Sequence, residues 1–430
     1  MSWQKVKLGK VCFIEKGTTG IQKAIPGKYP LVVTSEERKS HNEFQFDSDA
    51  VIIPLVSSTG HGHRSLKRIH FQQGKFALGS ILCAVIPKDK TSLSAEYLYR
   101  FLDLNKENEL VSRMRGMANV TLPLKEIAEI EIPLPSLKDQ HLFVEKYKNL
   151  ENQSQFLSTE LTHQLHLVQK LRQQLLQEAV QGKLVPQDPS DESASILLQK
   201  IKAEKERLVK EKKIKKDKDL PEIKAEEIPF EIPEGWVWCR LGEICSKIGS
   251  GSTPKGSNYS KEGVPFFRSQ NVYDEGLVYD DITLISPEVH TQMAGTIVYA
   301  TDILLNITGG SMGRCALVPN EFEVGNVSQH VCIIRPVGVV NSFYHIVVRS
   351  PFFQKFILSS TTGAGREGLP KYNLEQFIIP LPPLAEQHRI VQKLEQLLQV
   401  CDTLQASIQE SRGYNEQLLQ QVLREALKGE

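Results

Sequence analysis

The sequence predicts an α+β fold in which two duplicated mixed α/β domains are separated by two long helices, paired as an antiparallel coiled coil with pseudo-twofold symmetry. A ten-residue segment occurs twice, as Ile-Pro-Leu-Pro-Ser-Leu-Lys-Asp-Gln-His at 132–141 and Ile-Pro-Leu-Pro-Pro-Leu-Ala-Glu-Gln-His at 379–388. Short apolar runs broken by turns precede each copy, and a long amphipathic pattern follows it. These three observations indicate an internal duplication with an offset of 247 residues.

Apolar side chains recur three and four residues apart after each copy, the spacing of a coiled-coil seam. Asp139 and Glu386 place negative charge in the first helical turn, where the helix dipole favours it. A single amphipathic helix cannot bury its seam, so we expect the two helices to pair with each other. Parallel packing, or packing onto a partner protein, is the alternative. The expected pairing residues are Phe143, Tyr147, Leu150, Leu157 and Leu161 in the first helix, and Ile390, Leu394, Leu397, Leu404 and Ile408 in the second.

The predicted organisation has five segments. They are a first domain at 1–135, a central helix at 136–182, a linker with a charged helix at 183–228, a second domain at 229–381 and a distal helix at 382–430. The start of the second domain shares a Leu-Gly pair and a following Cys with the start of the first, at Leu241 and Leu8. The second domain is therefore expected to be a diverged copy of the first.

The composition is that of an ordinary soluble protein. No apolar run approaches the ~18 residues of a membrane span, and the first residues do not form a signal peptide. The chain has seven cysteines and no Cys-x-x-Cys motif, which fits free thiols in a reducing compartment. We therefore expect a cytoplasmic protein with no membrane partner.

Charge gives uneven support for nucleic-acid binding. The net charge is +1, with 19 Lys and Arg against 14 Asp and Glu in residues 1–135, and 11 against 14 in 229–381. The excess of positive charge favours nucleic acid weakly in the first domain and not in the second. A lysine run at 210–216 is interpreted as a solvated helix face, with phosphate contact as the alternative.

The sequence shows no recognisable catalytic constellation. His61 and His63 lack a third ligand at a metal-binding spacing, so no metal site is predicted. Residues 363–368 fit Gly-x-Gly-x-x-Gly but are followed by Leu-Pro where a dinucleotide-binding helix would begin. We expect no catalytic residue and no cofactor in this chain.

The whole pattern resembles the DNA-specificity subunit of type I restriction–modification enzymes. The resemblance rests on the doubled Ile-Pro-Leu-Pro segments, on Gly182-Lys183-Leu184, on Ile232-Pro233-Glu234-Gly235-Trp236 and on Gly251-Ser252-Thr253-Pro254. The first domain departs from the second, because it is fourteen residues shorter between shared landmarks and has Gly-Thr-Thr-Gly at 17–20 in place of the Gly-x-Thr-Pro form.

The resemblance implies two target-recognition domains, each reading half of a split double-stranded DNA sequence, with the helices spacing them and docking two methyltransferase (modification) subunits. Those partners would supply S-adenosylmethionine chemistry at adenine. A restriction subunit, a nuclease–translocase that uses ATP and Mg, would join them. The alternatives are a specificity subunit of another methyltransferase system, a self-sufficient nuclease or methyltransferase, and a coiled-coil adaptor that binds no DNA.

Base edges in the major groove are read by side chains that donate and accept hydrogen bonds. We expect these side chains on polar loops of both domains. The candidate DNA-binding residues are Arg64, Arg113, Arg115 and Asn119 in the first domain, and Lys255, Arg268, Gln270, Asn271, Ser311, Arg314 and Arg366 in the second.

Overall fold

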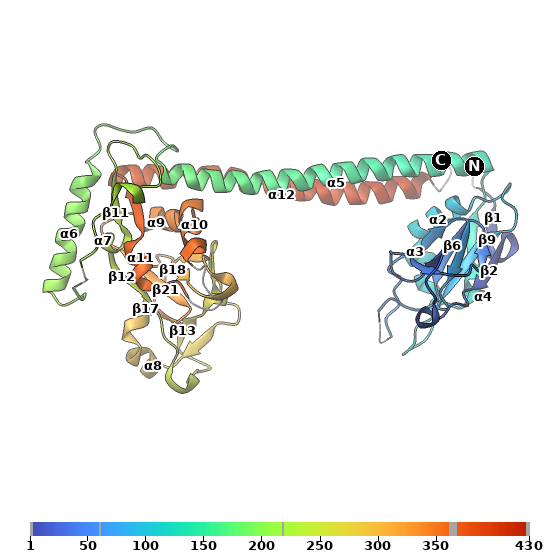
Figure 1. The fold of residues 1–430 in the computed structure, drawn as a ribbon, viewed down its shortest axis with the longest axis horizontal. Helices are drawn as coiled ribbons and strands as arrows, with labels where there is room; N and C mark the ends of the chain where they lie inside the picture. Colours follow the sequence, from blue (N-terminus) through green and yellow to red (C-terminus); the bar gives the residue numbers. More distant parts are fainter. Residues whose placement is uncertain (1–2, 60–61, 217–218, 361–367, 427–430) are drawn as a thin grey trace. The chain divides into compact units, whose positions relative to one another are not determined.

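The computed structural model describes residues 3–59, 62–216, 219–360 and 368–426. The chain divides into two compact units, one formed by Met1–His163 with Ile408–Glu430 and the other by Gln164–Ser407. Each unit contains one α+β domain and a portion of each long helix, α5 (Leu137–Val180) and α12 (Leu384–Ala426) (Figure 1).

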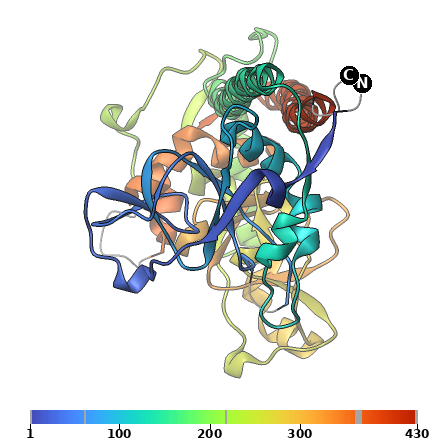
Figure 2. The same cartoon turned by 90° about the vertical axis from the view of Figure 1, so that its right-hand side faces the viewer.

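The domain of the first unit is built from two four-stranded sheets (Figure 2). The first sheet has the order β2 (Cys12–Lys16), β9 (Leu82–Pro87), β6 (Ala50–Pro54) and β7 (His70–Gln72), with every pair antiparallel. The second has the order β4 (Lys39–His41), β3 (Tyr29–Val32), β8 (Lys75–Leu78) and β5 (Phe46–Asp47). Strands β3 and β8 run parallel.

Helices cover the first sheet and join it to the start of α5. The helical elements are α1 (Leu8–Val11), η1 (Ile21–Lys23), α2 (Ala95–Leu104), α3 (Lys106–Glu109), η2 (Val111–Arg113) and α4 (Leu124–Ala128). Strand β1 (Lys5–Lys7) pairs with β10 (Glu131–Pro133) just before α5 begins. One apolar core contains Tyr97 and Phe101 of α2 together with Phe143 and Tyr147 of α5. The long helix is therefore part of the domain at its N-terminal end.

The second domain repeats this topology strand for strand. One sheet has the order β12 (Cys245–Ser250), β21 (Val331–Pro336), β18 (Ile303–Asn306) and β19 (Cys315–Leu317). The other has the order β16 (Thr283–Ile285), β13 (Val264–Phe267), β20 (Gly325–Val327) and β17 (Ile297–Val298), with β13 and β20 parallel. Strand β11 (Val237–Arg240) pairs with β22 (Ile378–Leu381), as β1 pairs with β10. The predicted α+β class and duplication are confirmed.

The remaining elements of the second domain include an insertion. Helices α7 (Leu241–Ile244), α9 (Asn341–Arg349), α10 (Pro351–Ser360) and α11 (Lys371–Gln376) accompany η4 (Lys255–Ser257), η5 (Ser269–Asn271), η6 (Ala294–Thr296) and η7 (Gly309–Ser311). Between β13 and β17, a hairpin of β14 (Val272–Tyr273) and β15 (Gly276–Leu277) and helix α8 (Pro287–Gln292) have been added. These additions account for the greater length of this domain.

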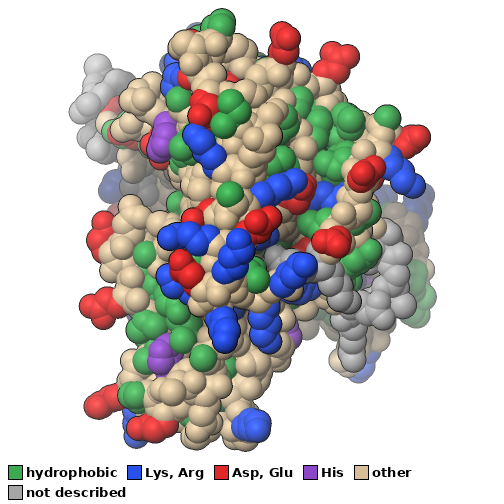
Figure 3. Space-filling model, turned by 90° about the vertical axis from the view of Figure 1, so that its left-hand side faces the viewer, with side chains coloured by type: hydrophobic (Ala, Val, Ile, Leu, Met, Phe, Trp, Pro, Cys, Tyr) green, Lys and Arg blue, Asp and Glu red, His purple; other side chains and the backbone are tan. Residues whose placement is uncertain are grey.

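The linker contains α6 (Ala194–Lys210) and η3 (Ala225–Glu227). Helix α6 packs on the second domain through a buried face of Ala194, Leu197 and Ile201. Lys205 Nζ donates to Gly242 O at 2.6 Å, and Lys202 pairs with Glu243 at 2.8 Å. The face of the molecule that carries α6 shows Lys and Arg side chains interspersed with Asp and Glu (Figure 3).

Within each unit the two long helices run antiparallel. In the first unit Asn415 Nδ2 donates to Ser154 O at 3.0 Å, and Leu419 packs against the cluster that includes Leu150. In the second unit Arg172 Nη2 donates to Asp402 Oδ1 at 2.5 Å. As the residue number rises along α5, that of its neighbour in α12 falls. The predicted antiparallel pairing is confirmed in each unit, and a twofold axis relating the units stays a prediction.

The structure corrects the predicted seam at several positions. Phe143 and Tyr147 pack into the first domain, where the rings of Phe143 and Tyr97 lie 5.5 Å apart, because α5 begins on that domain. Leu157 and Leu404 are 43% and 45% exposed, so the fold covers each of them only in part. Among the other predicted pairing residues, Leu161, Ile390 and Leu394 are buried, and Leu150, Leu397 and Ile408 are half-buried.

Candidate nucleic-acid interface

Polar loops leave one edge of the two sheets in the second domain. Parallel strands β13 and β20 both end at this edge, and β12 and β18 end there beside the first residue of β21. We call the segments that follow these strands, residues 251–257, 268–271, 307–314 and 328–330, the second edge loops. They bring together side chains that are up to about eighty residues apart in the sequence.

Hydrogen bonds hold these loops to one another. Gly251 N donates to Val331 O at 3.0 Å, and Ser328 N donates to Phe267 O at 3.0 Å. A Cβ on Gly251 would lie 1.8 Å from the carbonyl oxygen of Val327, so only glycine fits there. The side chains are joined as well: Thr253 Oγ1 donates to Gln329 Oε1, and Thr308 Oγ1 lies 2.7 Å from His330 Nδ1. The loops therefore form one surface that is held together by hydrogen bonds between them.

Most of the described candidates in the second domain lie on this surface. Lys255, Gln270 and Arg314 are exposed, and the Arg314 guanidinium lies 4.9 Å from the centre of the Tyr273 ring. Arg268 and Ser311 are half-buried, and Arg268 Nε is buried without a hydrogen-bond partner among the described residues. Arg366 lies outside the described residues.

Asn271 is a correction to the sequence-based expectation. Its side chain is fully buried, Nδ2 donates to Val278 O at 3.0 Å, and Oδ1 accepts from Arg268 N at 3.1 Å. An amide that already bonds to the backbone inside the domain has no surface to offer a base. Asn271 instead holds the β14–β15 hairpin against the edge.

The first domain has the same edge. Gly17 N donates to Leu82 O at 2.9 Å, as Gly251 does to Val331, and Gly79 N donates to Val32 O at 3.0 Å, as Ser328 does to Phe267. A Cβ on Gly17 would lie 2.3 Å from Gly79 O. The Gly-Thr-Thr-Gly segment therefore occupies the place of Gly-Ser-Thr-Pro although it lacks the proline.

The four candidates of the first domain are brought together by two loops of this edge. We call residues 55–59, 62–64 and 111–121 the first edge loops. Ser57 N donates to Val120 O at 3.0 Å, and Arg64 Nη1 donates to Ser112 O at 3.5 Å. Arg113 pairs with Glu109 at 3.2 Å, and Arg115 pairs with Glu126 at 2.7 Å while its side chain stays 69% exposed. Arg64 and Asn119 are also exposed.

Sequence reasoning missed the polar pairs Thr253–Gln329 and Thr308–His330. Their residues stand next to glycines or in polar turns, which is a signal for a loop but not for proximity across the sheet edge. Only the strand order brings them together. They connect the second edge loops to one another.

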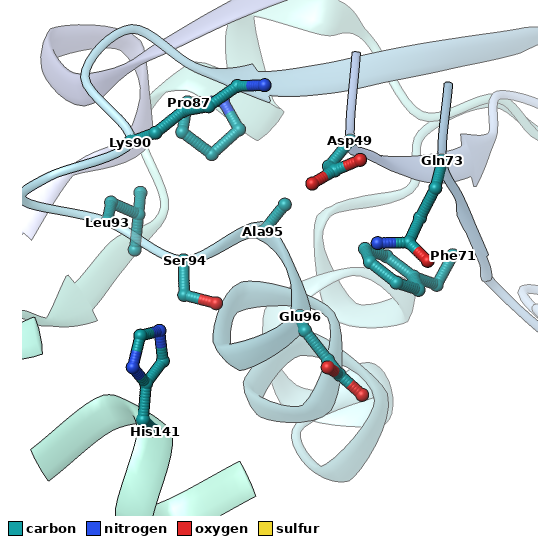
Figure 4. Close-up of a pocket in the computed structure, with 10 residues that line it drawn as sticks. All are labelled: Asp49, Phe71, Gln73, Pro87, Lys90, Leu93, Ser94, Ala95, Glu96 and His141. Carbon is teal, nitrogen blue, oxygen red and sulfur yellow. The ribbon is translucent and has the colours of Figure 1, made fainter. Parts of the chain in front are cut away.

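A cavity of about 200 Å³ lies in the first domain away from the edge loops (Figure 4). Figure 4 shows Asp49 and Gln73 on one side of it and Ser94 with His141 on the other. The corresponding place in the second domain holds Asn341, which donates to Thr301 O at 2.8 Å, whereas α2 of the first domain begins with Ala95. Within the described ranges, no group of three or more His, Cys, Asp and Glu is arranged to hold a metal.

The fold and the two edges define a class of protein. Its members have two similar domains that carry polar edge loops, and each domain continues into one of two paired helices. The family model for the type I restriction modification DNA specificity domain matches residues 1–166 and 233–411. The chain belongs to this family. In the part of the chain that the structure describes, no helix is long and apolar enough to cross a membrane.

Curated relatives agree with the family. The chain is 34% identical over 291 residues to the type I restriction enzyme EcoAI specificity subunit of Escherichia coli, an alignment that covers 66% of this chain and 48% of that protein. It is 24% identical over 443 residues to the EcoDI specificity subunit of the same species, covering all of this chain and 89% of the relative. The matched region thus spans about half the length of the EcoAI subunit.

Solved structures share the fold. A chain from a study of complex assembly and conformational transition of the type I R-M system superposes with a TM-score of 0.60 at 20% identity, covering 100% of this chain and 98% of that one. The HsdS subunit from Thermoanaerobacter tengcongensis gives a TM-score of 0.54 at 20% identity, with coverage of 100% and 97%. At this identity the likeness concerns the fold alone.

Proposed function

We propose that this chain is the DNA sequence-specificity subunit of a type I restriction–modification complex and carries out no reaction itself. Each domain reads one half of a bipartite target through its edge loops. The observation that supports this most is the equivalent construction of the two edges, where the same strand ends and the same backbone hydrogen bonds present polar loops in both domains.

The proposed base and phosphate contacts come from a reduced set of residues. In the first domain they are Arg64, Arg113, Arg115 and Asn119, and in the second they are Lys255, Arg268, Gln270, Ser311, Arg314 and Arg366. Asn271 is omitted because it is buried. Arg and Lys match guanine edges and phosphates, whereas Asn and Gln match adenine edges.

Charge points to a shared interface rather than to binding by this chain alone. Residues 229–381 contain 11 Lys and Arg against 14 Asp and Glu, so the second domain neutralises few phosphates. In the proposed complex the methyltransferase subunits hold much of the DNA backbone. They also supply S-adenosylmethionine chemistry at adenine, and a nuclease–translocase subunit that uses ATP and Mg joins them.

The long helices carry a duplicated set of exposed apolar residues. In the first unit the set is Leu157, Tyr414 and Leu418. In the second unit it is Leu404, Leu167 and Leu171. Each residue of one set is 247 positions from its counterpart in the other, and both sets draw on α5 and α12. Exposed apolar side chains at repeated positions mark protein-binding surfaces. They support two equivalent docking sites, one for each of two methyltransferase subunits.

A domain exchange tests the proposed reading of half-sites. Residues 229–378 are replaced by the matching domain of a relative with a different target, and the assembled methyltransferase is allowed to modify plasmid DNA. The expected result is a change in one half of the methylated motif only. The reciprocal exchange of residues 1–131 is the matched control and is expected to change the other half. A change in both halves after either exchange would contradict independent reading.

A further inference from the structure

Met117 is almost completely exposed. Its side chain is 94% accessible to solvent, the highest value among the large apolar residues of the described chain that are exposed. It lies at the tip of the segment between Arg115 and Thr121, in the first edge loops. A side chain this exposed makes little contact with its own domain and is accessible to a ligand.

The loop that carries Met117 is held in a defined position. Arg115 and Thr121 exchange two backbone hydrogen bonds, each 2.8 Å long, and close the loop at its base. Gly116 has a φ of 117°, and a Cβ there would lie 2.3 Å from Asn119 O. Gly62 lies against the tip, because a Cβ on that residue would be 2.5 Å from Met117 O. Met117 is thus a single apolar side chain on a turn that backbone hydrogen bonds hold in place.

The surroundings of Met117 favour DNA as its partner. Met117 shares the first edge loops with the exposed residues Arg64, Arg115 and Asn119, which are polar or positively charged. The exposed apolar residues that recur at equivalent positions in the two units, and so suit a protein partner, lie instead on the long helices. Proteins that bend DNA commonly insert an unbranched or bulky apolar side chain, methionine included, between two base pairs while flanking cations hold the phosphates.

We propose that Met117 inserts as a wedge between two adjacent base pairs of the first half-site and unstacks them. This inference rests on the proposed function of the edge loops. The insertion is specific to the first half-site, because the residue 247 positions later is Ala364, which is too short to separate base pairs. The preference for a base sequence at that step then depends partly on the free energy needed to unstack the two base pairs. This free energy is lowest at pyrimidine–purine steps.

The test uses the full-length chain assembled with its methyltransferase partner, bound to duplexes that carry 2-aminopurine at successive purine positions of the target. Unstacking raises the fluorescence of this base. Met117→Ala removes the wedge, Met117→Gln keeps its length but makes it polar, and Met117→Leu keeps it apolar. Because the side chain is exposed, each variant is expected to unfold at the same temperature as the parent.

The expected result is a fluorescence increase at one step of the first half-site that is lost in Met117→Ala and Met117→Gln and kept in Met117→Leu. Specific affinity falls on the order of tenfold in the first two variants, as for the loss of one buried apolar side chain. A 2-aminopurine placed at the adenine that is methylated is an internal control. The methyltransferase flips that base, so its signal is expected to persist in all variants.

Unchanged fluorescence and affinity in Met117→Ala would overturn the wedge. So would loss of assembly with the methyltransferase in Met117→Ala, since Met117 would then be a protein contact. A parent complex that binds no sequence specifically would instead overturn the proposed function, and the parent is measured first so that the two failures are told apart.

Discussion

Gln140 and Gln387, 247 residues apart, form equivalent buried hydrogen bonds at the starts of the two long helices. Gln140 Oε1 accepts from Ser94 N at 2.8 Å, and Gln387 Oε1 accepts from Val340 N at 2.9 Å. Ser94 and Val340 are the residues that precede α2 and α9. In both cases Nε2 donates to a carbonyl of the proline segment before the helix, that of Pro135 or Pro382. Each glutamine therefore fixes its helix to its own domain.

Replacing either glutamine by alanine is expected to destabilise the domain to which it belongs. The change leaves a buried backbone N–H without an acceptor, which costs about 1–3 kcal/mol. Denaturant unfolding of Gln140→Ala and Gln387→Ala measures the loss. Gln153→Ala, at an exposed position of α5, is the control and is expected to unfold like the parent. Equal stability of all three variants would refute the anchoring role.

The first unit has a polar contact in the seam where the equivalent positions of the second unit hold a buried cysteine and a buried valine. In the first unit Asn415 bonds to Ser154, whereas the positions 247 residues away are Cys401 and Val168, both buried. A polar residue in a seam fixes register at a cost in stability. Asn415→Val is therefore expected to raise the free energy of unfolding by about 1 kcal/mol, measured with denaturant. The mirror variant Val168→Asn is expected to lower it, and a stabilising effect of that variant would contradict this view.

Each domain contains a histidine whose protonation opposes folding, His70 in the first and His345 in the second. Burial, and then Arg38 and Arg68, lower the pKa of His70 to about 4, and burial followed by Arg349 lowers the pKa of His345 to about 4. In the unfolded chain the pKa of a histidine is near 6.5, so the stability that depends on each neutral histidine is fully present above pH 6.5. As the pH falls towards 4 this stability is lost, and the free energy of unfolding falls by about 3 kcal/mol for each histidine.

Unfolding free energies measured between pH 7.5 and 4.5 test this expectation. His70→Gln and His345→Gln are each expected to flatten the fall on the acid side, and the exposed His63→Gln is the control. A variant with the same pH dependence as the parent would show that its histidine is not the group that titrates.

The duplicated apolar sets predict how many methyltransferase subunits each variant retains. Replacing Leu157, Tyr414 and Leu418 by serine is expected to remove one subunit, and replacing Leu404, Leu167 and Leu171 is expected to remove the other. Native mass spectrometry of the assembled complex gives the count. Serine at the exposed polar positions Gln153 and Thr403 is the control. Loss of both subunits from a single triple variant would contradict two independent docking sites.

The duplication, the long helices and the polar loops could be predicted from sequence because each depends on a local or repeated pattern. The sheet order could not, because β3 and β8 pair across more than forty residues of sequence without a local signal. Asn271 has the right chemistry for base reading, but its burial depends on Val278 and on the inserted hairpin. Periodicity located the apolar face of α5 but could not show that Phe143 faces the domain while Leu157 faces solvent.

The methylated motif tests the central claim most directly. Plasmid DNA from cells that make this chain with its methyltransferase is sequenced with detection of N6-methyladenine. The expected result is a bipartite motif, with two read half-sites and an unread gap of about one duplex turn or less between them. A matched variant adds one heptad to α5 and one to α12, which keeps the seam in register and lengthens each helix by about 10 Å. Its gap is expected to grow by roughly three base pairs. A single continuous motif would show that the two domains do not read separate half-sites, and an active lengthened variant with an unchanged gap would show that the helices do not set the spacing.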